Sequence, residues 1–112
     1  MQENNQIENE IVAKGLTAPR ITPADIEANI AAEYSFTADK ALTEAPTDEA
    51  LKLLTFYVIV LKNGFTVTGE SACASPENFD AEIGRKIARA NAVQKIWPLM
   101  GYELRSKLAR KE

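Results

Sequence analysis

Residues 53–97, LLTFYVIVLKNGFTVTGESACASPENFDAEIGRKIARANAVQKIW, decide the fold of this 112-residue chain. The segment Leu53–Leu61 is apolar at both alternating sets of positions, which predicts a strand that is covered on both faces. Asn63-Gly64 follows, and both residues tolerate the positive φ that a type I′ turn requires. Because Phe65–Ser71 then alternates between apolar and polar residues, we predict a β-hairpin whose second strand has one solvated face.

A long helix is predicted directly after this hairpin. Ser75 is expected to cap it, with Pro76 at the first helical position and acidic residues in the early turns. An apolar stripe on this helix is expected to lie on the hairpin, and its members are Phe79, Ile83, Ile87, Ala90 and Trp97. Pro98 should stop or kink the helix, because proline has no backbone N–H to donate.

The segments before the hairpin predict short helices. Residues 1–17 form an N-terminal amphipathic arm or short helix in which Ile7, Ile11 and Val12 recur at helical spacing before a C-cap at Gly15. The sequence 22–25, TPAD, is a helix start, and this second helix is expected to run to about Tyr34 with Ile26 and Ile30 on the same face. Residues 35–48 have no sustained period and predict a flexible surface connection.

The C-terminal segment is open to two interpretations. Tyr102, Leu104 and Leu108 fit a short helix, although residues 102–108 also alternate like a strand; the helix is favoured. The whole chain then predicts an α+β fold, with one domain at 18–112: a hairpin packed by one long helix plus short N- and C-terminal helices. Because two strands alone are marginal in water, we expect a homo-oligomer that completes or covers the sheet.

The amino-acid composition limits which catalytic groups the chain can use. The chain has no histidine and one cysteine, which removes the commonest general base and every Ser-His or Cys-His nucleophile. We therefore expect a non-enzymatic protein without metal or cofactor. Its apolar runs are far shorter than the ~20 residues of a membrane helix, and the start of the chain lacks a secretory pattern, so we expect no membrane partner and a cytoplasmic protein.

Charge is distributed unevenly. The net charge is −3, but acids predominate up to Ala50 and bases predominate after it. The two parts can attract each other within one chain or between subunits, or the basic part can meet an anionic partner. Ordinary solvated faces are the favoured interpretation.

The predicted long helix has a second stripe, which consists of Asp80, Gly84, Ala88, Asn91 and Lys95. Small Gly84 and Ala88 allow a backbone or a flat ligand to approach closely, and the polar members supply hydrogen bonds at its edges. Close packing of this stripe on a strand or a second copy is favoured over a ligand groove.

Two further candidate sites surround the start of this helix. The bend that contains Ser71, Cys73 and Ser75 is a candidate anion site at a helix N-terminus, although an ordinary capped helix is favoured, with Cys73 as a small buried side chain rather than a reactive thiol. Basic residues further along the helix, Arg85, Lys86 and Arg89, are candidates for contact with a nucleotide-like anion or with nucleic acid. Nucleic acid is the less favoured partner, because no aromatic residues are interleaved with these bases.

The run NGFTVTGESACASPENFDAEIGRKIARANAVQKIWPLMGY closely resembles the signature of a family of small tailed-phage and prophage proteins, typified by the products of genes forty-nine and sixty-six of enterobacterial podophages. The resemblance covers Leu54 to about Leu108 and, more loosely, residues 21–30. It implies a phage-encoded protein made in the cytoplasm of a host bacterium, but no particular activity. Where the family pattern has acids, this chain has Ala90 and Met100, which argues against a catalytic carboxylate at either position.

These observations predict an accessory phage protein that binds a host protein and so modulates the host or its defences. One alternative is an oligomeric sponge for a small anionic nucleotide signal. A second alternative is an accessory protein that binds nucleic acid.

Overall fold

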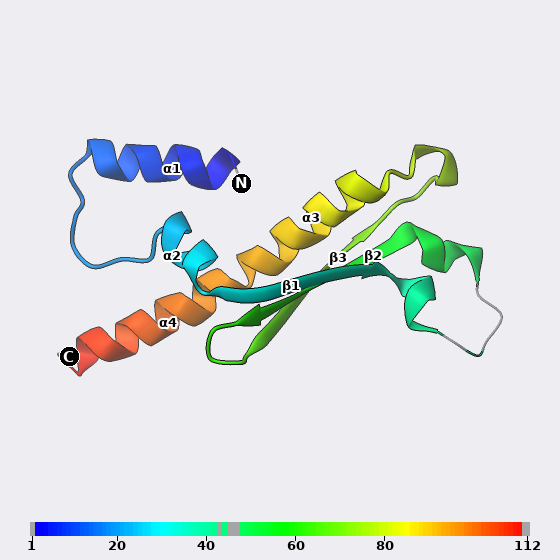
Figure 1. Ribbon diagram of the computed structural model, residues 1–112. Helices are drawn as coiled ribbons and strands as arrows, with labels where there is room; N and C mark the ends of the chain where they lie inside the picture. Colours follow the sequence, from blue (N-terminus) through cyan, green and yellow to red (C-terminus); the bar gives the residue numbers. More distant parts are fainter. Residues whose placement is uncertain (1, 43, 45–47, 111–112) are drawn as a thin grey trace.

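The computed structural model describes residues 2–42, 44 and 48–110 of the chain (Figure 1). Three antiparallel strands form one sheet in the order β1-β2-β3, and helix α3 (Ala81–Gln94) lies across one of its faces. The strands are β1 (Ile30–Thr37), β2 (Leu54–Leu61) and β3 (Thr66–Ala72). The predicted α+β class is confirmed, with one strand more than the expected hairpin.

The β2–β3 hairpin forms where the sequence places it, but its turn differs from the expected type. The N–H of Gly64 donates to the carbonyl of Leu61 at 2.9 Å, so the tight turn is centred on Lys62 and Asn63 rather than on Asn63 and Gly64. Gly64 follows the turn with a φ of 89°, and the Asn63 side chain accepts the N–H of Phe65. A type I turn followed by a left-handed glycine is a common longer hairpin connection.

Strand β1 corrects the largest error of the sequence analysis. The predicted second helix does begin at Thr22 with a capping box to Asp25, but it ends at Ala28, and the chain then enters β1 instead of staying helical to Tyr34. Residues 35–41, expected in a flexible connection, complete β1 and the 3-10 helix η1 (Ala38–Ala41). Pairing with β2 overrides local helix propensity here. Part of that predicted connection, residues 43 and 45–47, lies outside the described residues.

Helix α3 begins later and faces differently than predicted. Ser75 precedes only the short 3-10 helix η3 (Pro76–Asn78), and the cap of α3 is Asp80, whose carboxylate accepts the N–H of Ile83 at 3.0 Å. Ile83 and Ile87 are 56% and 47% exposed, so the expected packing of the apolar stripe on the hairpin is wrong for both. The buried face of α3 consists instead of Gly84, Ala88, Ala92 and Val93.

Pro98 explains the break between α3 and the last helix, α4 (Ile96–Ala109). The proline nitrogen cannot donate to the carbonyl four residues earlier, that of Gln94, and α3 ends at this residue. A new helix then starts with Pro98 in its first turn, where the missing N–H costs nothing. The predicted kink and the C-terminal helix are both confirmed, and α4 continues past the end of the sheet (Figure 1).

The N-terminal helices pack at the hairpin-turn end of the sheet. Helix α1 (Gln2–Ala13) ends as predicted at Gly15, with the N–H of Leu16 donating to Ile11 and that of Gly15 to Val12. Two hydrogen bonds of 2.6 and 2.8 Å join Arg20 to Glu8 of α1. Helix α2 (Pro23–Ala28) contributes the buried Ile26 to the core, whose other buried members are Ile59, Leu61, Val67, Ala92, Val93 and Ile96.

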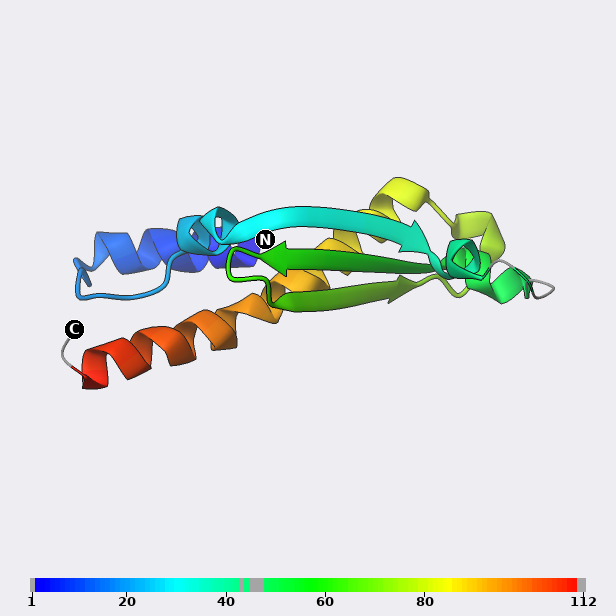
Figure 2. The same ribbon diagram turned by 60° about the horizontal axis from the view of Figure 1, so that its bottom comes forward.

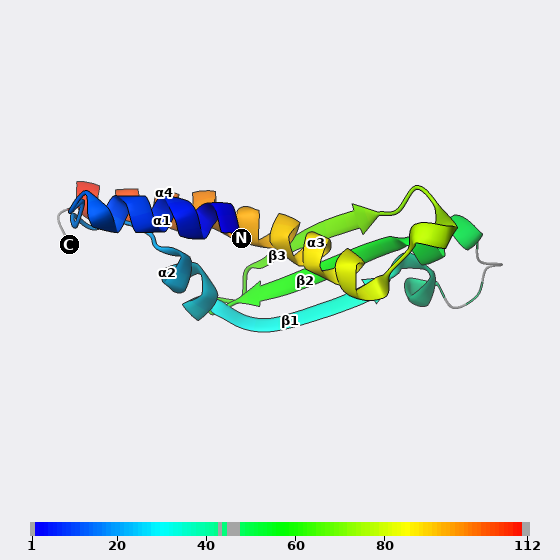
Figure 3. The same cartoon turned by 90° about the horizontal axis from the view of Figure 1, so that it is seen from above.

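The molecule is thin and long. Its radius of gyration is 17.5 Å and its extents are 55 × 29 × 17 Å, whereas a compact chain of this length has a radius of about 13 Å. Helix α3 lies over β2 and β3 (Figure 3), and Figure 2 shows the other face of the sheet, which no described helix covers. None of the described helices is both long enough and apolar enough to span a membrane.

Candidate functional site

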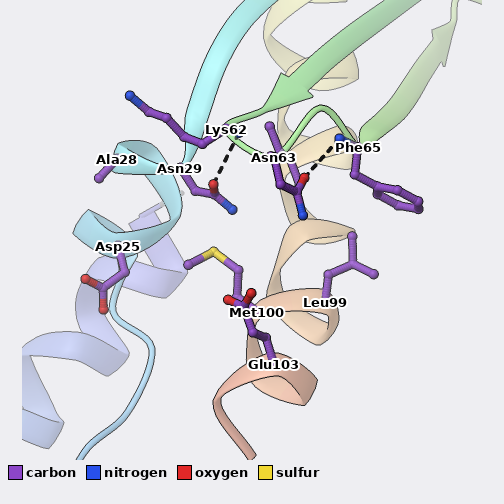
Figure 4. Close-up of a pocket in the computed structure, with 10 residues that line it drawn as sticks. Asp25, Ala28, Asn29, Lys62, Asn63, Phe65, Leu99, Met100 and Glu103 are labelled. Atoms are coloured by element: carbon purple, nitrogen blue, oxygen red, sulfur yellow. Dashed lines mark hydrogen bonds between the residues drawn. The ribbon is translucent and has the colours of Figure 1, made fainter. Parts of the chain in front are cut away.

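An open cleft of about 680 Å³ lies between α2, the β2–β3 turn and α4 (Figure 4). The pairing of β1 with β2 brings the end of α2 beside the hairpin turn, and α4 forms the third side of the cleft. The cleft is lined by Asp25, Ala28, Asn29, Leu61, Lys62, Asn63, Phe65, Leu99, Met100 and Glu103.

Apolar side chains form the floor and one wall of the cleft. Leu61 is buried at the end of β2, and Met100 of α4 is half-buried against the same core. Phe65 and Leu99 lie at the open side, with 56% and 39% of their surfaces exposed. Such exposed large apolar side chains beside a cavity are typical of a surface that binds another molecule.

Hydrogen bonds fix the frame of the cleft. The backbone N–H of Lys62 donates to the backbone carbonyl of Asn29 at 2.9 Å and approaches the side-chain oxygen of Asn29 at 3.3 Å. These bonds join the end of α2 to the hairpin turn. Because the Asn63 side chain also holds the backbone of Phe65, the turn residues that face the cleft are held by polar contacts on both sides (Figure 4).

The rim of the cleft is polar and slightly acidic. Asp25 and Glu103 contribute carboxylates, whereas the Lys62 side chain extends away from Met100 and Glu103 (Figure 4). Asp25 already accepts the N–H of Thr22 as part of the α2 cap. The cleft therefore offers an apolar floor with two carboxylates around it, an arrangement suited to an apolar side chain that is followed or preceded by a cation.

The stripe residues predicted on the long helix have different environments. Gly84 is buried on Thr55 of β2, where an added Cβ would lie 3.0 Å from the Thr55 hydroxyl oxygen. The amide of Asn91 donates to the backbone carbonyl of Glu70 at 2.9 Å and so satisfies an edge group of β3. Asp80 caps α3, and Lys95 is exposed at the junction of α3 and α4. The small residues of the stripe pack on the sheet, as the packing interpretation expected.

The predicted anion site lies beside part of this stripe. Ser71 and Cys73 line a cavity of about 280 Å³ together with Asp80 and Gly84, so the fold brings members of two predicted sites to one place. The electrostatics oppose an anion there, because the Asp80 carboxylate occupies the helix N-terminus and the Ser75 hydroxyl donates to Glu77. The Cys73 thiol is half-buried and donates to the carbonyl of Ser75 at 3.1 Å.

Arg89 is held within the chain. Its guanidinium donates to Glu27 at 2.8 and 3.2 Å and to Glu33 at 2.7 Å, so this base of the second half pairs with two acids of the first half within one chain. These bonds raise the pKa of Arg89 above its ordinary value. The Arg89 hydrogen bond also lowers the pKa of Glu33, while burial raises the pKa of Tyr57, whose hydroxyl donates to Glu33 at 2.5 Å.

The two other candidate bases differ from Arg89. Lys86 lies 3.5 Å from Glu82 on the exposed side of α3. Arg85 forms no ion pair within residues 2–42, 44 and 48–110 and lines a cavity of about 380 Å³ with Lys40, Ser35 and Thr37. The three bases therefore do not form one free basic patch.

The sequence analysis did not identify the cleft. Its residues come from three separate segments, residues 25–29, 61–65 and 99–103, and follow no motif. The one usable signal was the position of two apolar residues, Phe65 directly after the hairpin turn and Leu99 directly after Pro98, where loops and helix starts are usually polar.

No curated protein and no solved structure matches this chain. Residues 21–108 match the model of the Phage protein (N4 Gp49/phage Sf6 gene 66) family, and this range includes β1, β2, β3, α3 and nearly all of α4. The match extends over most of the chain and agrees with the resemblance of residues 63–102. The chain thus belongs to the Phage protein (N4 Gp49/phage Sf6 gene 66) family.

Proposed function

We propose that this phage protein is a non-enzymatic binding protein that acts in the host cytoplasm, where it binds a host protein and so modulates the host or its defences. The observation that carries the proposal is the cleft beside α4, with its apolar floor and polar rim. Its lining supplies amide, carboxylate and hydrocarbon groups. These groups suit recognition of a protein segment.

The chemistry of the cleft narrows the kind of segment that fits. Phe65 and Leu99 present apolar surface that gains free energy when a partner's aliphatic or aromatic side chain covers it. Asp25 and Glu103 favour a neighbouring lysine or arginine on that partner. We therefore expect a host protein with an exposed apolar side chain flanked by a basic residue.

Affinity capture from host lysate tests this proposal when it is done with matched variants. Leu99→Glu adds a charge to the apolar wall and should reduce capture of a specific host protein at least about tenfold, which corresponds to about 1.4 kcal/mol. Ile83→Glu is the control, because Ile83 is also an exposed apolar residue of a helix but lies on α3, away from the cleft. Equal capture by both variants, or loss with Ile83→Glu alone, would contradict the proposed site.

A second candidate function, the binding of a small anionic nucleotide, rests on a different cavity. Lys40 and Arg85 border the 380 Å³ cavity between β1, β2 and the start of α3, and neither base is ion-paired within the described part of the chain. Ser35 and Thr37 add hydroxyl groups. Two cations with nearby hydroxyls suit a phosphate group, although Asp39, which accepts the Thr37 hydroxyl, places one negative charge close by.

This second candidate is tested by titrating adenosine monophosphate into the purified full chain and measuring heat. The candidate predicts saturable binding that the double change Lys40→Ala and Arg85→Ala abolishes. Lys86→Ala is the control, since Lys86 is paired with Glu82 outside the cavity. Absence of binding, or equal loss in the control, would exclude a mononucleotide site here.

A further inference from the structure

Helix α1 lies at the periphery of the fold. Figure 1 shows it outside the sheet, at the end of a loop formed by residues 14–22. Residues 14–19 of this loop are exposed, and within the described part of the chain no backbone hydrogen bond joins them to a strand. The family match begins at residue 21 and so does not include α1. The helix can therefore change position without breaking the pairing of any strand.

The contact between α1 and the rest of the fold is loosely packed. The Trp97 groove, the apolar surface that α1 covers, consists of Pro23, Ile26, Val93 and Trp97. Two cavities of about 180 and 160 Å³ remain between this groove and α1, whereas well-packed protein layers leave few voids larger than a water molecule. Among residues 5–13 of α1, none is buried and only Glu8 and Ile11 are half-buried.

Trp97 carries a cost while α1 covers it. This side chain lines both cavities, and its indole N–H is buried without a hydrogen-bond partner among the described residues. A buried donor without a partner is unfavourable, because it has lost its bond to water and gained none in return. A Trp97 side chain that α1 no longer covers can donate to water, and this favours release of the helix.

One ion pair opposes that release. The Arg20 guanidinium donates to both carboxylate oxygens of Glu8, at 2.6 and 2.8 Å, and both side chains are half-buried. Such forked pairs fix geometry as well as adding attraction. The other ion pair that involves α1 among the described residues, between Lys14 and Glu10, lies within one turn and does not reach the rest of the fold. The attachment of α1 therefore depends on Glu8 and Arg20.

We infer that α1 is a detachable arm, which covers the Trp97 groove when Glu8 is paired with Arg20 and leaves the groove open when the pair is broken. An isolated helix of 12 residues is marginal in water, so the released arm also loses helical structure. The sheet and α3 stay folded in both states. The Trp97 groove shares no lining residue with the cleft beside α4, so the arm controls access to a second, separate surface.

Quenching of tryptophan fluorescence by acrylamide in the full chain tests this inference, because Trp97 is the one tryptophan. Arg20→Gln should increase quenching and shift the emission to longer wavelength. The exchange of both charges, Glu8→Arg with Arg20→Glu, should restore the wild-type values. Lys14→Gln is the control, since it breaks only the pair within one turn. Unchanged quenching in Arg20→Gln, an equal increase in Lys14→Gln, or failure of the charge exchange to restore it would overturn the inference.

Hydrogen exchange of the same proteins shows which part of the chain opens. In the wild type, the amides of α1 should exchange faster than those of β2, and Arg20→Gln should accelerate exchange in α1 alone. Faster exchange in both elements would mean that the whole fold is destabilised. Equal protection of α1 and β2 in the wild type would mean that α1 opens only when the whole fold does. Either result would overturn the inference.

Discussion

Gly69 of β3 and Ala88 of α3 bring the backbones of strand and helix into direct contact: a Cβ added to Gly69 would lie 2.2 Å from the carbonyl oxygen of Ala88. The same Cβ would lie 2.4 Å from the backbone nitrogen of Ala92. No side chain separates the two layers at this point. The small face of α3 is therefore the buried one, because it alone lets the helix lie this close to the sheet.

Gly69→Ala should destabilise the fold by about 2–3 kcal/mol, since the methyl group meets backbone atoms that cannot move aside locally. Gly101→Ala is the matched control: nothing lies within 4 Å of its added Cβ, and alanine is favoured in a helix by about 1 kcal/mol. Urea denaturation of both variants should give opposite shifts of the midpoint. If Gly69→Ala leaves the urea midpoint unchanged, α3 does not lie this close to β3.

Thr55→Val should leave stability unchanged or raise it by up to about 1 kcal/mol. Thr55 is 3% exposed, and its hydroxyl has no hydrogen-bond partner among the described residues, so valine removes an unsatisfied polar group while keeping the shape. Thr37→Val is the comparison, because it removes the hydrogen bond to Asp39 and should cost about 1 kcal/mol. Thermal unfolding distinguishes the two; a clear loss with Thr55→Val would mean that the hydroxyl has a partner.

Replacing isoleucines by serine tests which face of α3 is buried. Ile83→Ser should change the free energy of unfolding of the monomer by no more than about 0.5 kcal/mol, because Ile83 is exposed. Ile59→Ser should cost about 3 kcal/mol or more, since Ile59 is fully buried beneath the helix. Chemical denaturation followed by circular dichroism gives both values, and a similar cost at the two positions would mean that α3 is rotated.

Arg89→Lys should destabilise the fold by about 1–2 kcal/mol, because lysine cannot reproduce the forked contacts to Glu27 and Glu33. Lys86→Gln is the control and should stay within about 0.5 kcal/mol, as expected for a solvent-exposed pair. Urea midpoints at neutral pH measure both changes. If the Arg89→Lys protein is as stable as the wild type, the contacts of Arg89 with Glu27 and Glu33 do not contribute to the stability of the fold.

The same cluster makes stability depend on pH in two windows. The pKa of Glu33 is lowered, chiefly by its Arg89 hydrogen bond, so its stabilising contribution is present above the unfolded pKa of about 4.3 and is lost as pH falls through the folded value. The pKa of Tyr57 is raised, chiefly by burial, so its contribution is present below about pH 10 and is lost as pH rises through the folded value. Glu33→Gln should flatten the acid window when urea midpoints are measured from neutral to acid pH; an unchanged acid slope would contradict this assignment.

Sequence reasoning identified those elements whose signals are local. The capping box of Thr22, the glycine after α1, the pairing of β2 with β3 and the interruption near Pro98 each depend on a few neighbouring residues and were predicted correctly, although the hairpin turn lies one residue earlier than expected. Strand β1 was missed because residues 26–34 carry a helical period, whereas the alternation of Ala32, Tyr34 and Phe36 gains meaning only from pairing with β2. On α3 the packing of Gly84 and Ala88 on a strand was predicted correctly, whereas the large Ile83 and Ile87 were wrongly expected on the hairpin, because close approach to the sheet favours small residues.

The candidate sites were less predictable for the same reason. Arg89 could be recognised as a base, but its pairing with Glu27 and Glu33 depends on residues 56 to 62 positions away in the chain. The cleft depends on the relative placement of α2, the hairpin turn and α4, which no single segment specifies. Packing between distant segments decides these features.

Photocross-linking inside host bacteria tests the central claim, that the cleft beside α4 holds a host protein. A photoreactive phenylalanine analogue is placed at Phe65 in the cleft, and at Ile83 on α3 as the control. After illumination, we expect a discrete adduct between this chain and a host protein from position 65 and none from position 83. Adducts from position 83 alone, or no host adduct from position 65, would contradict it.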